Sequence, residues 1–270
     1  MSTFTDRWRG NFDGNGSSQG DLFLFDNFGN NAIWLMNGAG NQAAGANLPF
    51  TGPTWHAKAI AEFNDAGLPD SDILWQNDDG RVALWQMNGM TLVGGQDLPN
   101  PGAGWHANFA NDFNGNTAAD ILFQHDNGSL AIWTFAGGGT PVMNGGFNVP
   151  QNPGPGWHAA ATGDTSGDGR AGIVFQHDNG SIAIWENPVF NPAGTVSFGA
   201  QADLQFVGPT WHVMGMGDVN GDLRSDIILQ NDDGRIAVWE MGGPTGTTII
   251  GGFNVAQNPG TGWHVAAVRT

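Results

Sequence analysis

The chain has 270 residues and a formal net charge of −17, with 25 acidic residues, eight lysines and arginines, and no cysteine. This excess of negative charge leaves few groups that could neutralise phosphates, so nucleic acid and anionic membrane surfaces are excluded as expected partners. Disulfides cannot contribute to stability, whereas 12 tryptophans and 17 phenylalanines supply apolar surface for a core.

The N-terminal segment MSTFTDRWRGNFDG lacks an apolar stretch of signal-peptide length, and nowhere in the chain do eighteen apolar residues follow one another. We therefore expect no membrane insertion. We expect an extracellular or cell-surface location without a cleavable signal peptide, and a cytoplasmic location stays open because cysteine is absent. The oligomeric state also stays open, a homodimer included.

A unit of about fifty residues recurs along the chain. The dipeptide Trp-His marks its start at Trp55-His56, Trp105-His106, Trp157-His158, Trp211-His212 and Trp263-His264. A second block, typified by SDILWQNDDGRVALW, also occurs five times and ends at Trp34, Trp85, Trp133, Trp185 and Trp239. Five blocks predict five structural repeats.

Each unit has the pattern of four short strands separated by turn residues. In the last unit these are residues 211–217 (WHVMGMG), 226–230 (DIILQ), 235–241 (RIAVWEM) and a strand near 248–255 (TIIGGFNV). We predict an all-β, five-bladed β-propeller of four-stranded antiparallel blades, which forms a single domain over residues 1–270. Residues 4–11 and 263–270 both match a first strand, so we expect the N- and C-terminal segments to close the ring.

The order W-H, D-x-N-G-D, S-D-I-x-x-Q-N-D-D-G and A-x-W resembles the FG-GAP and VCBS-type repeats of integrin-like propellers and many bacterial surface proteins. The resemblance covers nearly the whole chain. It implies the propeller fold, whereas repeats of this kind serve adhesion, ligand binding and scaffolding alike. Some propellers with similar repeats, fungal ones among them, are lectins that hold sugars between neighbouring blades.

Integrin-type repeats place a calcium loop, D-x-[DN]-x-D-G-x-x-D, between the first two strands. Calcium takes about six to eight oxygen ligands, so the number of acidic side chains in a loop decides whether it can bind. The fifth repeat keeps the full spacing with Asp218, Asn220, Asp222 and Asp226. In the fourth repeat Gly172 replaces the last carboxylate. The four residues of the fifth loop are therefore candidate ligands of a structural calcium ion; the alternative is that they only form Asx-turns.

The turns between the second and third strands are expected on the same face of the disc as the Trp-His pairs, because each turn reverses the chain. They contribute Gln76, Asn77, Asp78, Asp79, Gln124, His125, Asp126, Asn127, Gln176, His177, Asp178, Asn179, Gln230, Asn231, Asp232 and Asp233. Carboxylates and amides pair with sugar hydroxyls, and aromatic rings pack against the C–H face of a pyranose. With the five Trp-His pairs, these residues are predicted to bind carbohydrate at about four similar sites. The first repeat has Phe25 to Phe28 here, so its site is expected to be absent or different.

Purely structural interpretations of the same residues stay open. The sequences N-D-D-G and H-D-N-G form good hairpin turns whatever they contact, and a tryptophan can wedge adjacent blades while histidine bonds a carbonyl. The tryptophans that end the second block alternate with apolar residues and are expected to pack inside the blades.

All seven histidines occupy repeated positions, so no single histidine stands out as a general base. The sequence also lacks H-E-x-x-H, G-x-S-x-G and P-loop motifs. We therefore expect a multivalent lectin for glycans or glycoconjugates rather than an enzyme. A glycosidase that uses aspartates from two blades stays open. So do an integrin-like adhesion or protein-binding propeller and a calcium-stabilised scaffold.

Overall fold

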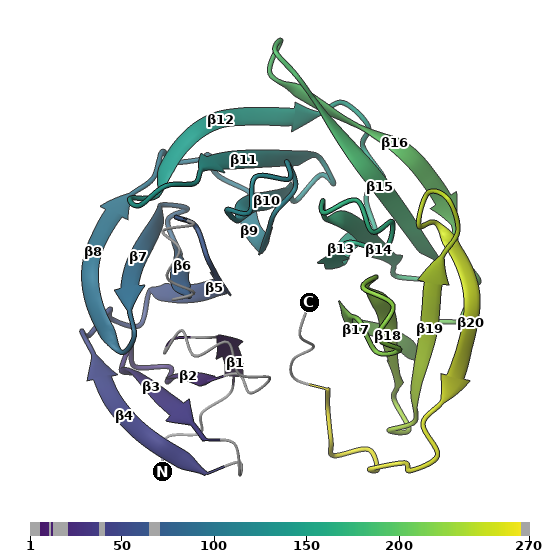
Figure 1. The fold of residues 1–270 in the computed structure, drawn as a ribbon, viewed down its shortest axis with the longest axis horizontal. Helices are drawn as coiled ribbons and strands as arrows, with labels where there is room; N and C mark the ends of the chain where they lie inside the picture. Colours follow the sequence, from purple (N-terminus) through teal and green to yellow (C-terminus); the bar gives the residue numbers. More distant parts are fainter. Residues whose placement is uncertain (1–5, 11, 13–20, 38–40, 65–70, 266–270) are drawn as a thin grey trace. The chain divides into compact units, whose positions relative to one another are not determined.

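The computed structural model describes residues 6–10, 12, 21–37, 41–64 and 71–265. The regular structure of this part of the chain consists of strands, β1 to β20 (Figure 1). None of the described segments is a helix long and apolar enough to cross a membrane. The chain divides into two compact units, of which the first contains residues 1–110, 116–123 and 135–144 and the second contains residues 111–115, 124–134 and 145–270.

Every repeat contributes four strands. The first repeat contains β1 (Asp6–Gly10), β2 (Asp21–Phe25), β3 (Asn31–Met36) and β4 (Gln42–Leu48). The second contains β5 (Trp55–Ala61), β6 (Asp72–Asn77), β7 (Val82–Asn88) and β8 (Thr91–Asp97). The third contains β9 (Trp105–Asn111), β10 (Asp120–His125), β11 (Leu130–Ala136) and β12 (Val142–Val149). The fourth contains β13 (Trp157–Gly163), β14 (Gly172–His177), β15 (Ile182–Asn191) and β16 (Thr195–Asp203). The fifth contains β17 (Trp211–Gly217), β18 (Asp226–Asn231), β19 (Ile236–Gly242) and β20 (Thr248–Asn254).

Within each repeat the four strands neighbour one another in chain order. The pairing is antiparallel in the first, second, fourth and fifth repeats. The third and fourth repeats join into an eight-stranded sheet through β12 and β16. That junction is the parallel pairing of Asn148 with Thr195, supported by a hydrogen bond from the Asn148 N–H to the Gly194 carbonyl (3.0 Å).

The predicted strand positions agree closely with the structure. Trp55, Trp105, Trp157 and Trp211 each begin a strand, because a Trp-His pair follows a glycine- or proline-containing loop in every repeat. In the fifth repeat, predicted strands 211–217, 226–230, 235–241 and 248–255 correspond to β17–β20. Of the two segments predicted to close the ring, residues 4–11 contain β1, whereas the described residues 263–265 of the second segment are not in a strand. Residues 4, 5, 11 and 266–270 lie outside the described residues, so the ring closure stays a prediction.

A β-bulge interrupts the first strand at the same place in three repeats. The register shifts between Ala57 and Ala59 in β5, and the bulge falls at the equivalent places in β13 and β17. The residues at the three bulges are Lys58, Ala160 and Met214. A bulge redirects a side chain relative to the regular pleat, so this position can vary without loss of the sheet.

The core lies between neighbouring repeats inside each unit. In the first unit, Phe23 of β2 meets Trp75 of β6 with ring centroids 5.8 Å apart, in a cluster with Ile33 and Ile73. In the second unit, apolar residues of β14 and β15 pack with those of β18.

The tryptophans at the end of the second block mostly pack as predicted. Trp85 contacts the Trp75 ring at 5.0 Å, and Trp185 contacts the Phe175 ring at 4.8 Å. Trp34 is the more exposed exception, at 41%. We therefore assign this set of residues to packing rather than to binding.

Candidate functional site between neighbouring repeats

The hairpin turn between the second and third strands is fixed by its own residues. In the second repeat the Gly80 N–H donates to the Asn77 carbonyl (2.9 Å) and the Asn77 N–H donates to the Arg81 carbonyl (2.8 Å). Gly80 has φ +90°, which favours glycine. The Asp78 N–H donates to the carbonyl of Thr54, the residue before Trp55 (2.9 Å). The turn and the Trp-His pair therefore lie together, as the sequence predicts.

A histidine and an aspartate meet at this junction in three repeats. The Nε2 atom of His56 lies 2.7 Å from Oδ1 of Asp78, and the equivalent distances are 2.9 Å for His158–Asp178 and 2.8 Å for His212–Asp232. The side chains of His56 and Asp78 are 49% and 62% exposed, so the pair contributes little to folding stability. A solvent-facing pair of hydrogen-bonding groups is available to a ligand.

The glutamine before each turn has a structural use. The Gln76 side chain donates from Nε2 to the Trp105 carbonyl (2.8 Å), and its Oε1 accepts the Ala107 N–H (2.9 Å). Gln124, Gln176 and Gln230 make the same two bonds to the first strand or Trp-His segment that follows. Gln76 is 4% exposed. Because both amide atoms are engaged, these glutamines join neighbouring repeats, and this structural role stands beside the predicted sugar contact.

The residue after each glutamine shapes the turn. Asn77 is buried, its Nδ2 donates to Thr54 Oγ1 (3.0 Å), and its Oδ1 accepts the Asp79 N–H (3.1 Å). Asn231 makes the same contacts, while Nδ1 of His125 and of His177 accepts the N–H of Asn127 and of Asn179. These contacts favour the structural interpretation for this position.

Asp79 and Asp233 hold arginines. Oδ2 of Asp79 accepts Nε of Arg81 at 2.8 Å, and Oδ2 of Asp233 accepts Nε of Arg235 at 2.7 Å. The main-chain N–H of Arg81, with help from its guanidinium, keeps the pKa of Asp79 below its ordinary value. Each carboxylate therefore stays charged and positions its arginine over a tryptophan.

Neighbouring side chains contact the indole rings of several Trp-His pairs, which limits the ring surface on which a sugar could stack. Arg81 lies over the Trp55 ring at 5.4 Å and Arg235 over the Trp211 ring at 5.5 Å, while Trp157 makes an edge contact with His177 at 5.1 Å. Trp263 differs, because it is 70% exposed. A sugar that stacks on indole would find the most accessible ring at Trp263.

Two cavities with similar linings lie beside the His56–Asp78 and His212–Asp232 pairs. A cavity of about 450 Å³ is lined by His56, Lys58 and Asp78 of the second repeat and by Gly104, Trp105 and His106 at the start of the third. A cavity of about 300 Å³ is lined by His212, Met214 and Asp232 of the fifth repeat and by Thr261, Trp263 and His264 of the segment that follows. Each site therefore takes side chains from one repeat and from the next Trp-His segment.

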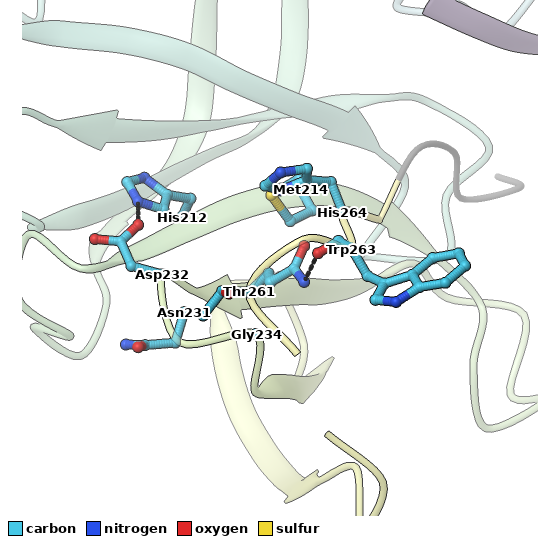
Figure 2. A pocket seen from close by; sticks show the side chains of 9 residues that line it. His212, Met214, Asn231, Asp232, Gly234, Thr261, Trp263 and His264 are labelled. Atoms are coloured by element: carbon cyan, nitrogen blue, oxygen red, sulfur yellow. Dashed lines mark hydrogen bonds and ion pairs between the residues drawn. The ribbon is translucent and has the colours of Figure 1, made fainter. Parts of the chain in front are cut away.

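Figure 2 shows the second of these cavities. The His212–Asp232 pair stands on one side, and a second dashed line ends at Trp263, whose carbonyl accepts a hydrogen bond from Gln230. The indole of Trp263 extends away from the pair. His264 and Met214 complete the lining. His212, Asp232 and His264 are thus among the polar groups that line the cavity, together with Asn231 and Thr261.

The candidate calcium loop uses its carboxylates within the protein. Asp218 Oδ1 accepts the N–H groups of Gly221 (2.6 Å) and Asp222 (3.1 Å), and its Oδ2 accepts that of Leu223 (3.0 Å). Asp226 is buried and accepts from Val219 and Met241, and Asn220 Nδ2 donates to Asp222 Oδ2. Among the described residues no group of three acidic or histidine side chains is arranged to hold a metal ion. This arrangement favours Asx-turns over the calcium site.

Comparisons with known proteins were made by family model, by sequence and by structure. No family model matches the chain, and no curated protein matches its sequence. The structure of Raptor from Chaetomium thermophilum is similar over 95% of this chain and 21% of its own, with 11% identity and a TM-score of 0.53. The Dos1 propeller is similar over 95% of this chain and 60% of its own, with 13% identity and a TM-score of 0.48. The fold is a β-propeller. This chain spans about a fifth of the first neighbour and three fifths of the second.

The site contains two residues that the sequence analysis did not select. Lys58 and Met214 stand two positions after the histidine and line the two cavities. Both occupy the bulge of the first strand, where the regular alternation of side chains is interrupted. Because they differ between repeats, a search for repeated residues passes over them.

Proposed function

We propose that this protein is a carbohydrate-binding, five-bladed propeller of the FG-GAP and VCBS type, with similar sites between neighbouring repeats. One observation supports this above all: an exposed histidine–aspartate pair recurs in three repeats, with nearly constant distances. A pair that contributes little to stability and yet recurs is best explained by a repeated ligand.

The proposal of five blades rests on the five successive groups of four strands. The eight-stranded sheet is consistent with it, because one parallel residue pair joins two groups that are otherwise four-stranded. Each blade would then present its second turn and its Trp-His pair at one face.

Sugar suits the chemistry of these sites. The aspartate accepts hydroxyl protons, the histidines donate or accept, and the apolar lining packs against pyranose carbons. The cavities are small and solvent-facing, as expected for weak individual sites that gain strength on a glycan-coated surface. Glycans or glycoconjugates are therefore the proposed partners, at a cell surface or outside the cell.

The decisive test is a glycan array with the labelled protein, followed by titration of the best monosaccharide. We expect saturable binding that is lost when Asp78, Asp126, Asp178 and Asp232 are all replaced by alanine. A control variant, D97A/D203A, removes two exposed carboxylates of β8 and β16 and should bind as the wild type does. Thermal melts of both variants check that the fold is retained.

The proposal fails if no glycan binds, or if the fourfold variant binds as well as the control. In the first case a pull-down would test the adhesion or protein-binding alternative. In the second, the histidine–aspartate pair is not the binding group.

A further inference from the structure

The cavity between the second and third repeats contains the only lysine of the chain. Lys58 occupies the bulge of β5 and lines the cavity of about 450 Å³ together with His56, Asp78 and His106. Lys58 stands two residues after His56, the histidine of the pair. The lysine is therefore in a position to contact whatever the pair binds.

The Lys58 ammonium group has no direct partner within the described part of the chain. The nearby carboxylates are used by other residues: Asp78 bonds His56, and Asp79 bonds Arg81. Burial lowers the pKa of Lys58, and the charge of Asp78 opposes that shift. A half-buried ammonium group without a hydrogen-bond acceptor is stabilised by a ligand that supplies one. An anionic oxygen forms a stronger hydrogen bond with it than a neutral oxygen does.

The cavity after the fifth repeat provides a natural comparison. It has the same histidine–aspartate pair, His212 and Asp232, and the same glutamine hydrogen bond to the following Trp-His segment. At its bulge stands Met214, which has no charge. The residue at the bulge therefore carries a positive charge in one cavity and none in the other.

We propose that the Lys58 cavity binds a sugar that carries a carboxylate, of the hexuronic acid class, whereas the Met214 cavity binds a neutral sugar. This inference rests on the proposed carbohydrate binding. The sugar carboxylate would accept from the Lys58 ammonium, and a sugar hydroxyl would donate to Oδ2 of Asp78. The chain has a net charge of −17, which repels an anionic ligand. A cationic side chain in the cavity, here Lys58, is therefore needed to bind a sugar carboxylate.

The test uses matched pairs of sugars that differ only at carbon six: glucose and glucuronic acid, galactose and galacturonic acid, mannose and mannuronic acid. Binding is measured by calorimetry and by chemical-shift changes at low salt. For at least one pair we expect the wild type to prefer the acid, and K58M to weaken binding of that acid about tenfold with the neutral sugar unchanged. Methionine is the natural residue at the equivalent position, so K58M should fold.

The reciprocal variant M214K should gain a second site for the same acid. If the acids bind no more tightly than their neutral partners, or if K58M binds the acid as the wild type does, the inference is overturned while the lectin proposal stands. If neither kind of sugar binds, both are overturned. A thermal melt of each variant excludes loss of fold as the cause.

Discussion

The loop between the first two strands is held by a buried carboxyl group in both the fourth and the fifth repeats, but the carboxyl group comes from different strands. In the fifth repeat, Asp226 at the start of β18 accepts the Val219 N–H (3.0 Å). In the fourth, Gly172 stands at the place of the aspartate, and Glu186 reaches across from β15 to accept from Thr165 Oγ1 (2.6 Å) and, more weakly, from its N–H (3.4 Å).

The glutamate fills the space that an aspartate would need. A Cβ atom added to Gly172 would lie 2.2 Å from Oε1 of Glu186. In the fifth repeat, where Asp226 occupies this space, the equivalent Glu240 turns the other way and lies against Gly251. The comparison teaches that in both repeats one buried carboxyl group accepts hydrogen bonds from the loop, whichever strand supplies it. This role gives an acidic residue at the end of the loop a structural function that requires no ion.

The largest effect is expected from adding the missing aspartate. G172D would force Glu186 out of its place and bury a second carboxylate, so we expect a loss of about 3 kcal/mol in the free energy of unfolding. The double variant G172D/E186T copies the third repeat, which has Asp120 and Thr134 at these positions, and should recover at least half of that loss. Urea unfolding measures both. A double variant as unstable as G172D would show that the two carboxylates are not interchangeable.

How much the sequence could predict differs between fold and site. Strand positions follow from Trp-His spacing and from turn residues, because those signals are local. The role of Gln76 could not be predicted, because its partners, Trp105 and Ala107, lie about thirty residues away in the next repeat. The replacement of the aspartate by Glu186 was also missed, since the sequence shows only that Gly172 lacks a carboxylate. The pairing of His56 with Asp78 was not predicted, although both residues were correctly placed together.

The next effect concerns pH. Burial raises the pKa of Glu186 from 4.5 to about 8, against the opposing hydrogen bonds from Thr165. Between these values the folded chain keeps a proton that the unfolded chain releases, so stability should fall as pH rises from about 4.5 to 8 and then level off. The slope is at most about 1.4 kcal/mol per pH unit.

Glutamine is a close replacement for the protonated acid, so E186Q should remove most of this decline. Denaturant unfolding at several pH values compares it with E240Q, a control at the equivalent and more exposed position of the fifth repeat. E240Q should keep the wild-type profile. A wild-type profile in E186Q would mean that other groups set the pH dependence.

The smallest effect is expected from calcium. The carboxylate of Asp218 already accepts three main-chain N–H groups, so an ion would have to displace bonds that hold the turn. We expect millimolar calcium to raise the melting temperature by less than about 1 °C, because an ion stabilises only in proportion to its binding to the folded state. A saturable rise of several degrees, reversed by a chelator and absent in D218N/D222N, would instead establish the calcium site that the spacing of the fifth loop suggests. That result would also distinguish the fifth loop from the fourth. In the fourth loop Gly172 stands where Asp226 supplies a carboxylate in the fifth, so we expect no calcium binding there.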